Sequence, residues 1–510
     1  MARNSHFQQS ALVGFVQSVG DSAPAATHPK NLHLPIEIPR NIWYNKLIYY
    51  VPHFTHERNI PMNNVKVYDK PLMPLSDLLT AIDAGELDAT FETLGSAGGA
   101  PVQRERVKAL CATFAAMYGA DREVGLFTVA GRSELSGNHT DHNHGCVIAA
   151  SISLDVLAVA SPRADGIIRL KSEGFDEDVV DITAYTTPDE SKLGTSAALI
   201  AGVCRGFVNN GYAIGGFDAC TVSTVFKGSG LSSSAAFEDM IGTILSHLYN
   251  GGSVDEVSFS KISQYAENKF FGKPCGLMDQ VACAVGGIVA IDFADPTAPV
   301  IEPLPFDMTA AGYHLCIVNT GGNHADLTDD YAAVPAEMKA VAAHFGKPVL
   351  REVTTEQVIA AIPALRETVG DRAILRALHF LSENDRVASQ KAALETAIAA
   401  TDEASRDAAV ESYFKGVLAS GRSSFCYLQN VYTTKNISEQ GLSLALCLCE
   451  SFFADGKGAF RVHGGGFAGT IQAYVPTERV EAFTALMDGA FGQGATADLR
   501  IRSVGAARIA

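Results

Sequence analysis

Several features that are common in other protein classes are scarce in this 510-residue sequence. It has one tryptophan, and 8% of its residues are aromatic. No apolar run reaches about 18 residues, the length that crosses a membrane, and the longest candidate, 147–160, is interrupted by Asp155. Lys and Arg number 39 against 56 Asp and Glu, a formal charge of −17. The sequence therefore predicts neither a membrane span nor a nucleic-acid partner, since polyanions are bound by clustered basic residues.

Paired cysteines with the spacing of a zinc site are also missing. The ten cysteines are scattered, and Cys447 and Cys449 form a lone C-x-C within an apolar helical pattern. In a chain of this size they predict reduced core residues and a cytoplasmic protein. Hydrophobic residues make up 47% of the chain, which excludes disorder for most of it and is enough for two large domains.

The first 61 residues differ in texture from the rest, and residues 1–40 show no helical or strand period. Three interpretations remain open: a flexible tail, a small docking element built on residues 42–51, or an upstream extension that the cell does not make. We expect residues 1–61 to be a disordered N-terminal extension. The native start at Met62 is a hypothesis that intact-mass spectrometry of the endogenous protein would test.

Apolar periodicity in the body predicts a mixture of helices and strands. Helices are expected within 75–118 and over 196–209, 233–248, 259–271, much of 330–451, and 478–491. Strands are expected over 125–132, 147–160, 167–171, 179–183, 221–226, 287–293, 313–320, 459–463 and 471–475. This order predicts an α+β fold, divided where prolines cluster near 292–305 into domains 62–300 and 301–510.

One segment, FKGSGLSSSAA at 226–236, has the features of a phosphate site. A strand is expected to end there, two glycines allow a tight turn, and three serines open an alanine-rich helix. Free backbone N–H groups and the helix dipole favour an anion at such a place. The segment is neither a Walker A loop nor a dinucleotide fingerprint, and alone it also fits a serine-capped helix.

A second segment, GRSELSGNHTDHNHG at 131–145, concentrates charged residues and histidines after an apolar strand. His139, His142 and His144 suggest a metal, but the spacing of a catalytic zinc site is absent. A solvated polar loop is the plain alternative.

Two further segments contain glycine turns. RVHGGGFAG, 461–469, contains G-x-G-x-x-G, but a strand rather than a helix is expected after it, which favours a loop that packs on a substrate. AENKFFGKPCGLMDQ, 266–280, places Asp279 among apolar residues, where a carboxylate needs a partner or a function. Arg132 is a suitable partner.

Together and in this order, the four segments resemble the GHMP small-molecule kinases, and the second resembles the galactokinase signature in particular. GRSELSGNHTDHNHG is similar to the family form GRxNLIGEHTDYNxG, and FKGSGLSSSAA to PxGxGLSSSA. PCGLMDQ is similar to PCGIMDQ, and RVHGGGFAG to RMTGGGFGG. The resemblance extends from Asp69 to the C-terminus.

This resemblance implies a two-domain fold with the active site in the interdomain cleft, and ATP-dependent phosphorylation of the anomeric hydroxyl of galactose. Asp279 and Arg132 would be catalytic, and Asn138, His139, Asp141 and Tyr331 would bind the sugar. ATP would be bound by Gly228, Ser229, Gly230, Leu231, Ser232, Ser233 and Ser234. Ser234 and Glu267 would bind Mg²⁺, with Ser233 as the alternative serine, and Gly464, Gly465 and Gly466 would close the site. The partners would be the sugar and ATP, and the protein a monomer or weak homo-oligomer.

Three departures from the family form fall at the sugar end. Asn138 replaces a glutamate, Glu134 replaces an asparagine, and His142 replaces a tyrosine. A kinase for a related sugar, galacturonate or N-acetylgalactosamine, therefore remains open beside galactokinase. A non-catalytic galactose sensor is the third alternative, although the residues implied in the reaction are present.

Overall fold

The computed structural model describes residues 71–95, 98–225, 231–273, 275–322 and 327–510. The extension predicted over residues 1–61 lies outside these ranges. All of the described residues belong to one compact unit, Met62–Ala510. Within them, no helix is long and apolar enough to cross a membrane.

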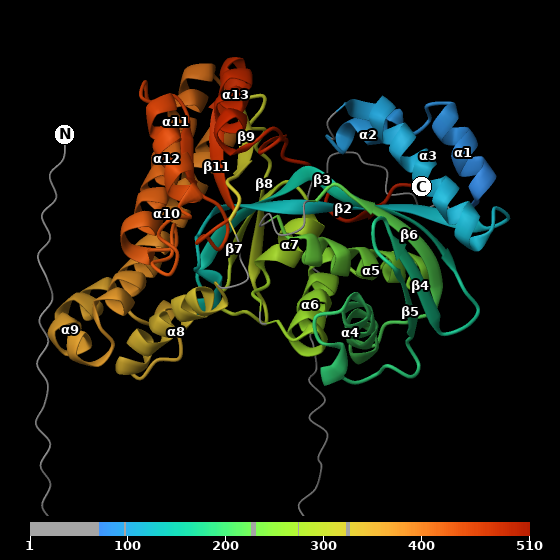
Figure 1. Ribbon diagram of the computed structural model, residues 1–510, viewed down its shortest axis with the longest axis horizontal. Helices are drawn as coiled ribbons and strands as arrows, with labels where there is room; N and C mark the ends of the chain where they lie inside the picture. Colours follow the sequence, from blue (N-terminus) through green and yellow to red (C-terminus); the bar gives the residue numbers. More distant parts are fainter. Residues whose placement is uncertain (1–70, 96–97, 226–230, 274, 323–326) are drawn as a thin grey trace, which may run out of the picture. The chain divides into compact units, whose positions relative to one another are not determined.

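A nine-stranded sheet forms the first lobe (Figure 1). Its main path runs β1-β2-β3-β6-β4-β5, while β13 pairs with β2, and β7 joins β3 to β8. Only β4 and β6 pair in parallel among these strands. The bounds are β1 Met73–Pro74, β2 Glu123–Ser136, β3 Cys146–Pro162, β4 Ile167–Ser172, β5 Glu177–Asp181, β6 Phe217–Ser223, β7 Ile288–Asp292, β8 Val300–Leu304 and β13 Ala507–Arg508.

Strand β3 is buried on both faces, and alternate residues serve different helix layers. Leu157 and Val159 pack with α1 Leu75–Asp83, α2 Asp88–Thr93 and α3 Gly99–Tyr118. Ala158 and Ala160 pack on the other face with α4 Ser196–Asn209, α5 Ser233–Tyr249 and α6 Glu256–Ala266. Figure 1 shows these two layers on opposite sides of the sheet. The helix α7, Met278–Val285, contacts β2, β3 and α5.

The second lobe contains a four-stranded antiparallel sheet in the order β10-β11-β9-β12. Its strands are β9 Tyr313–Asn319, β10 Ala459–Val462, β11 Thr470–Pro476 and β12 Thr496–Leu499. The helices are α8 Thr328–His344, α9 Thr355–Thr368, α10 Asp371–Ala399, α11 Glu403–Ser423, α12 Gly441–Phe452 and α13 Val480–Phe491. Residues of α12 and α13 pack on this sheet, whereas α8, α9 and α10 form a separate apolar cluster.

The α+β class and most of the expected elements are confirmed, with informative differences. The helical segment 75–118 is three helices, because Gly85 and Gly95 adopt left-handed backbone angles between them. The strand expected to end at Arg132 continues to Ser136 through two register shifts. The strand expected at 221–226 begins earlier, at Phe217, and ends at Ser223.

Strand pairing bears on the domain division at residue 300, which stays a prediction. The proline-rich segment holds β8, which pairs with β7 in the first sheet. The second sheet begins at Tyr313. The chain then returns to the first sheet at its end, where β13 pairs with β2. By strand pairing, the first sheet therefore includes strands from both sides of a break at residue 300, whereas all strands of the second sheet lie after it.

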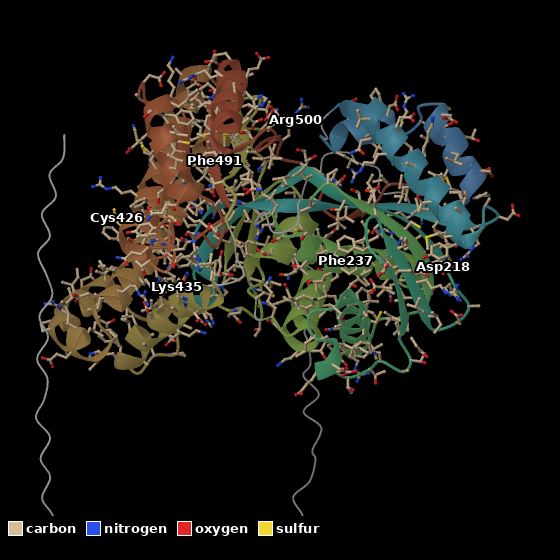
Figure 2. All side chains as sticks on the ribbon, viewed as in Figure 1. Asp218, Phe237, Cys426, Lys435, Phe491 and Arg500 are labelled. Carbon is tan, nitrogen blue, oxygen red and sulfur yellow. The ribbon has the colours of Figure 1, made fainter. Side chains whose placement is uncertain are left out.

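The ten cysteines, all among the described residues, are unpaired. The expectation that they are core residues is wrong for Cys426 and Cys447, which are exposed. Figure 2 labels Cys426 on the second lobe. Cys447 and Cys449 are two positions apart on α12, so they point to different sides, and only Cys449 is buried.

Candidate functional site

The predicted pairing of Arg132 with Asp279 is present. Arg132 lies in β2 just after the register shift at Gly131, and Asp279 is the second residue of α7. Arg132 donates from Nε to Oδ1 and from Nη2 to Oδ2 of Asp279, each at 2.8 Å. Ser232, the N-cap of α5, donates its hydroxyl to the same carboxylate from a left-handed backbone conformation. The carboxylate is thus oriented from both the sheet and the start of α5.

This ion pair keeps one partner accessible. The side chain of Arg132 is 8% exposed and that of Asp279 is 33% exposed. Burial would raise the pKa of Asp279, but the charge and hydrogen bonds of Arg132 outweigh it and hold the pKa below its ordinary value. Asp279 is therefore an ionised carboxylate that a ligand can reach.

A second carboxylate, Glu267, lies beside the start of α5. The Ser234 hydroxyl donates to its Oε1 at 3.2 Å, and Lys273 Nζ lies 3.1 Å from the same oxygen. Gln280 donates from Nε2 to Oε2 of Glu267 at 3.0 Å. Glu267 begins a single π-helical turn, Glu267–Phe271, after α6. Such turns often occur at functional sites, and this one places a buried carboxylate at the end of a regular helix.

The predicted magnesium ligands fit the chemistry of that ion. Ser234 and Glu267 offer a hydroxyl and a carboxylate, the hard oxygen donors that Mg²⁺ prefers. No group of three or more His, Cys, Asp or Glu in the described ranges is suited to hold a metal.

The described part of the predicted ATP segment comprises Leu231, Ser232, Ser233 and Ser234. Leu231 is buried, and the last two serines open the 17-residue helix α5. The N-terminus of such a helix favours phosphate. The predicted ligands Gly228, Ser229 and Gly230 lie outside the described residues.

The polar loop, residues 137–145, meets the glycine loop, residues 464–466. His139 Nε2 lies 2.9 Å from the carbonyl of Gly465, and Tyr331 donates its hydroxyl to the carbonyl of Gly466 at 2.7 Å. Because a carbonyl only accepts, the His139 proton is on Nε2. Burial lowers the pKa of His139 to about 4, so the ring is neutral at pH 7.

Asp141 lies in the same polar loop and approaches the turn before Asp279. A Cβ on Gly276 would come within 1.9 Å of Asp141 Oδ2, so only glycine allows this approach. Asp141 also accepts from the backbone N–H of His142 at 2.9 Å. The structure therefore brings Asp141 next to the segment that carries Asp279.

Asn138 differs from the other predicted sugar ligands. It is fully buried, and its amide has protein partners on both the oxygen and the nitrogen. Glu134, four residues earlier in β2, forms an ion pair with Arg461 of β10. Burial raises the pKa of Glu134, although Arg461 and Asn138 act in the opposite direction.

Sequence reasoning missed a buried polar network from the second lobe that supports the polar loop. His379 Nε2 lies 3.0 Å from the backbone carbonyl of Asn138, and Glu383 accepts from the N–H groups of Gly137 and Asn138 at 3.3 and 3.4 Å. Asn430 donates to Asn138 Oδ1 at 2.8 Å. No motif surrounds these second-lobe residues. For His379 and Glu383 in α10, the only signal in the sequence was the presence of charged and polar residues at core-facing positions of a helix.

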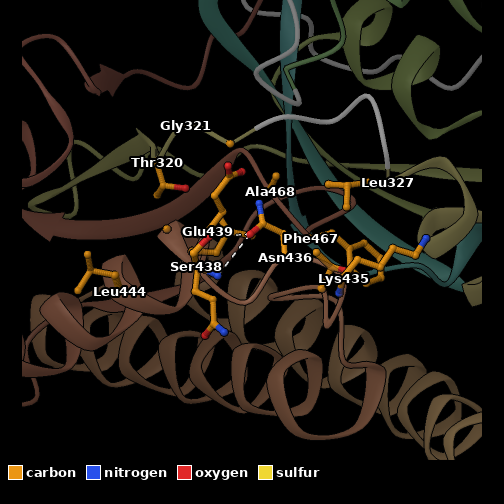
Figure 3. Close-up of a pocket in the computed structure, with 15 residues that line it drawn as sticks. Thr320, Gly321, Leu327, Lys435, Asn436, Ser438, Glu439, Leu444, Phe467 and Ala468 are labelled. Carbon is orange, nitrogen blue, oxygen red and sulfur yellow. Dashed lines mark hydrogen bonds between the residues drawn. The ribbon is translucent and has the colours of Figure 1, made fainter.

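A surface pocket of about 790 Å³ is lined by residues that directly follow the glycine loop in sequence (Figure 3). Phe467 and Ala468 line it together with Leu327 and the loop that carries Lys435 and Glu439. None of the residues predicted for the sugar, the nucleotide or the metal lines this pocket.

Known families match the regions that build this geometry. The galactokinase galactose-binding signature matches residues 112–162, and the GHMP kinases N-terminal domain matches residues 198–287. The galactokinase of Streptomyces coelicolor is 32% identical over 382 residues, 74% of this chain and 91% of that protein. The galactokinase of Mycobacterium tuberculosis H37Rv is 30% identical over 358 residues, 68% of this chain and 88% of that protein.

Solved structures agree at the level of the fold. Lactococcus lactis galactokinase, solved with galactose, has a TM-score of 0.65 at 24% identity, with 79% of this chain and 99% of that chain covered. Methanococcus jannaschii mevalonate kinase has a TM-score of 0.50 at 12% identity, with 74% and 98% covered. The fold and the site thus define a GHMP kinase. Within that class, the chain belongs to the galactokinase family.

Proposed function

We propose that this protein is an ATP-dependent sugar 1-kinase that converts galactose to galactose 1-phosphate. The observation that carries the proposal is the reachable carboxylate of Asp279, held by Arg132 and by Ser232 at the start of a phosphate-type helix. Phosphoryl transfer requires positioning and charge stabilisation rather than a covalent intermediate. This arrangement provides both, and membership of the family supports ATP as the phosphate donor.

In this proposal Asp279 accepts the proton of the anomeric hydroxyl as that oxygen bonds to the γ-phosphorus of ATP, while the bond from this phosphorus to the β,γ-bridging oxygen breaks and ADP leaves. Its lowered pKa keeps it ionised at neutral pH, so the proton-accepting form is always present. Arg132 orients the carboxylate through two parallel hydrogen bonds and stabilises negative charge beside it.

The phosphates of ATP would lie at the N-terminus of α5, against Leu231 to Ser234 and the adjoining Gly228, Ser229 and Gly230. Ser234 and Glu267 would hold Mg²⁺, with Ser233 as the alternative serine. When bound, this ion would offset the negative charge of the phosphate oxygens. Lys273, which contacts Glu267, adds positive charge at the same place.

At the sugar end we assign hydroxyl contacts to His139, Asp141 and Tyr331. His139 and Tyr331 contact the glycine loop, and Asp141 lies against Gly276 in the turn before Asp279. We further propose that the enzyme acts in the cytoplasm as a monomer or weak homo-oligomer. The ten unpaired cysteines support a reducing compartment.

The test is an ADP-release assay with Mg-ATP and a panel of galactose, galacturonate and N-acetylgalactosamine. We expect the highest kcat/KM for galactose, with galactose 1-phosphate as the product, and loss of activity on chelation of divalent ions. A preference for one of the other two sugars would contradict the galactose assignment. ATP binding without turnover of any sugar would favour a sensor.

A further inference from the structure

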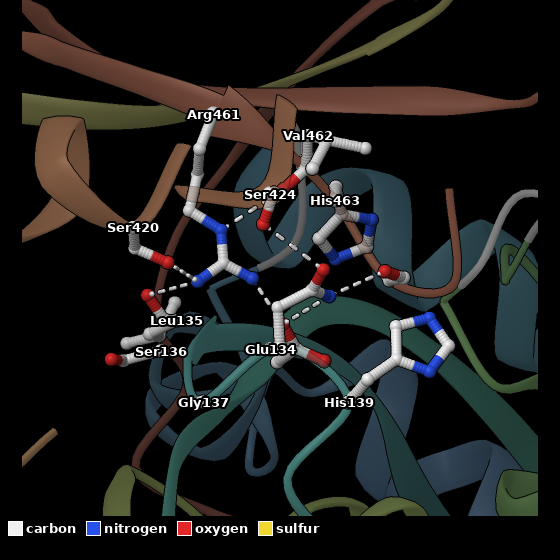
Figure 4. Close-up of polar contacts among 12 residues, drawn as sticks. Glu134, Leu135, Ser136, Gly137, His139, Ser420, Ser424, Arg461, Val462 and His463 are labelled. Atoms are coloured by element: carbon white, nitrogen blue, oxygen red, sulfur yellow. Dashed lines mark hydrogen bonds and ion pairs between the residues drawn. The ribbon is translucent and has the colours of Figure 1, made fainter. Parts of the chain in front are cut away.

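Three consecutive carbonyl groups of the glycine loop each accept a hydrogen bond from the sugar end of the site. Asn138 Nδ2 donates to Gly464 at 2.7 Å, while His139 and Tyr331 contact Gly465 and Gly466 as described above. The glycine loop and Tyr331, which is on α8, belong to the second lobe, and the polar loop belongs to the first. The bonds from Asn138 and His139 therefore cross between the lobes. Figure 4 shows this junction.

Among these three donors to the glycine loop, Asn138 also has further hydrogen-bond partners on its side-chain amide. Its Oδ1 accepts from Ser424 at 3.2 Å and from Asn430 at 2.8 Å. Its Nδ2 donates to Gly464 and, at 3.0 Å, to Glu134 Oε1. An amide has two N–H donors and two acceptor positions, so the protein uses all four.

The surroundings of Asn138 select an amide over a carboxylate. Its nitrogen faces two acceptors, the carbonyl of Gly464 and the carboxylate of Glu134. A negative oxygen placed there would be repelled by both in a fully buried site. The negative charge sits instead on Glu134, where Arg461 offsets it. This explains two of the departures from the family form. The family has asparagine at position 134 and glutamate at position 138, and this chain has the two residues exchanged.

Asn430 of the second lobe holds the glycine loop next to Asn138 and Glu134. Asn430 Nδ2 also donates to the carbonyl of Gly465 at 3.1 Å, so one side chain bridges Asn138 and the loop. A Cβ on Gly466 would come within 2.0 Å of the Asn430 carbonyl. The loop is therefore packed directly on Asn430, and the position of one determines that of the other.

We propose that Asn138 is a positioning residue, which holds the glycine loop against the polar loop and acts on the sugar only through that loop. The proposal replaces the expected direct contact of Asn138 with a sugar hydroxyl, and it rests on the proposed function. In this proposal, Glu134, Asn138 and Asn430 together fix the position of the glycine loop, and through that loop they determine the shape of the sugar site.

A cycle of enzyme variants and deoxysugars separates the two roles. A direct contact is lost together with its hydroxyl, so Asn138→Ala would then have little effect on the one deoxygalactose that lacks this hydroxyl. A positioning role predicts the same loss for galactose and for every monodeoxygalactose that keeps the anomeric hydroxyl. We expect Asn138→Ala to raise KM by about tenfold or more for each sugar, since several buried hydrogen bonds are lost, with a smaller change in kcat. Selective loss of the effect with one deoxysugar would overturn the proposal.

Hydrogen exchange gives a readout that does not depend on activity. We expect the amides of the glycine loop to exchange faster in Asn138→Ala than in the unaltered protein, with no sugar present. Unchanged exchange would overturn the proposal, whatever sugar the enzyme prefers. A failure of the proposed function would appear instead as an absence of galactose turnover in the unaltered protein.

Asn430→Ser tests the same junction from the second lobe, and it also serves if Asn138→Ala fails to fold. It should reproduce both the uniform rise in KM and the faster exchange. The matched control is Asn143→Ala, which changes another buried asparagine of the polar loop. Asn143 contacts Leu350 and Met338 rather than the glycine loop. If Asn143→Ala speeds exchange of the glycine loop as much as Asn138→Ala does, the specific role of Asn138 is wrong.

Discussion

Two arginine–carboxylate pairs begin on the same strand, β2, yet their surroundings differ. Arg132 holds Asp279, whose side chain is 33% exposed. Two residues further along, Glu134 pairs with Arg461, and these side chains are 6% and 0% exposed. The first pair leaves a carboxylate for a ligand to reach, whereas the second is closed off by protein.

The two pairs therefore suit different roles: the first can take part in a reaction, and the second can hold parts of the structure together. A reachable carboxylate can exchange a proton with a substrate, and a sealed pair can only fix the elements that carry it. The sealed pair links β2 of the first lobe to β10 of the second. Changes to the two pairs should therefore appear in different measurements, and the following predictions test that separation.

The largest expected effect is on the rate, from Asp279→Asn. The amide cannot accept the sugar proton, so kcat should fall by about 10²–10⁴-fold, the usual contribution of a general base. The midpoint of unfolding and the affinity for ATP should change little, because the contact with Arg132 is partly kept. Steady-state kinetics and nucleotide titration check both points. An unchanged kcat would remove Asp279 from the reaction.

The sealed pair should show the reverse pattern. Glu134→Ala leaves Arg461 buried without its carboxylate partner, and breaking such a pair typically lowers the free energy of unfolding by about 3–5 kcal/mol. Urea unfolding measures the loss. Replacing both residues with methionine should recover much of it, since an apolar pair leaves no buried charge. Equal stability of Glu134→Ala and the unaltered protein would contradict a structural role for this pair.

A smaller and pH-dependent effect is expected at Glu383, which supports the backbone of the polar loop. Burial alone would raise its pKa, but His379, Arg386, Arg461 and a hydrogen bond from Ser420 lower it to about 2. A carboxylate with a lowered pKa stabilises the fold above its unfolded pKa of about 4.3 and loses that contribution as the pH falls towards 2.

The lowered pKa of Glu383 corresponds to about 3 kcal/mol of stability lost across this pH interval. Glu383→Gln should therefore be less stable than the unaltered protein at pH 6, and the difference should shrink as the pH falls to 3. Unfolding midpoints at these two pH values give the comparison. Parallel losses in both proteins would place the acid sensitivity at other groups.

The contacts around Asp279 and Glu267 were predictable because these residues lie in short segments with recognisable chemistry. The pairing of Arg132 with Asp279 was expected because a carboxylate among apolar neighbours needs a partner, and because the family form implies Arg132, 147 positions earlier, for that role. The contact of Ser234 with Glu267 agrees with the family form. The local pattern did not reveal that β2 runs on to Ser136, because the two register shifts place polar residues within a buried strand.

The buried contacts between the second lobe and the polar loop could not be predicted in the same way. Glu383 lies in a long alanine-rich helix, and Asn430 follows a π-helical turn, Ser424–Leu428. Neither has neighbours in sequence that indicate its partner, which lies more than 200 positions away. Asn138 was assigned from the family form alone, and its four protein contacts became visible only in three dimensions.

The return of the chain to the first sheet has a consequence for how the protein is made. Arg502 pairs with Asp155 at 3.0 Å, both side chains are fully buried, and Arg502 also donates to Thr128 at 2.8 Å. The strand that carries Arg132 is thus completed by residues synthesised more than 340 positions later. Contacts between residues so far apart in sequence slow folding, and we expect the first lobe to be completed only after the end of the chain has been synthesised. A fragment ending at the apparent lobe boundary would leave Asp155 without Arg502, and β2 without its pairing with β13.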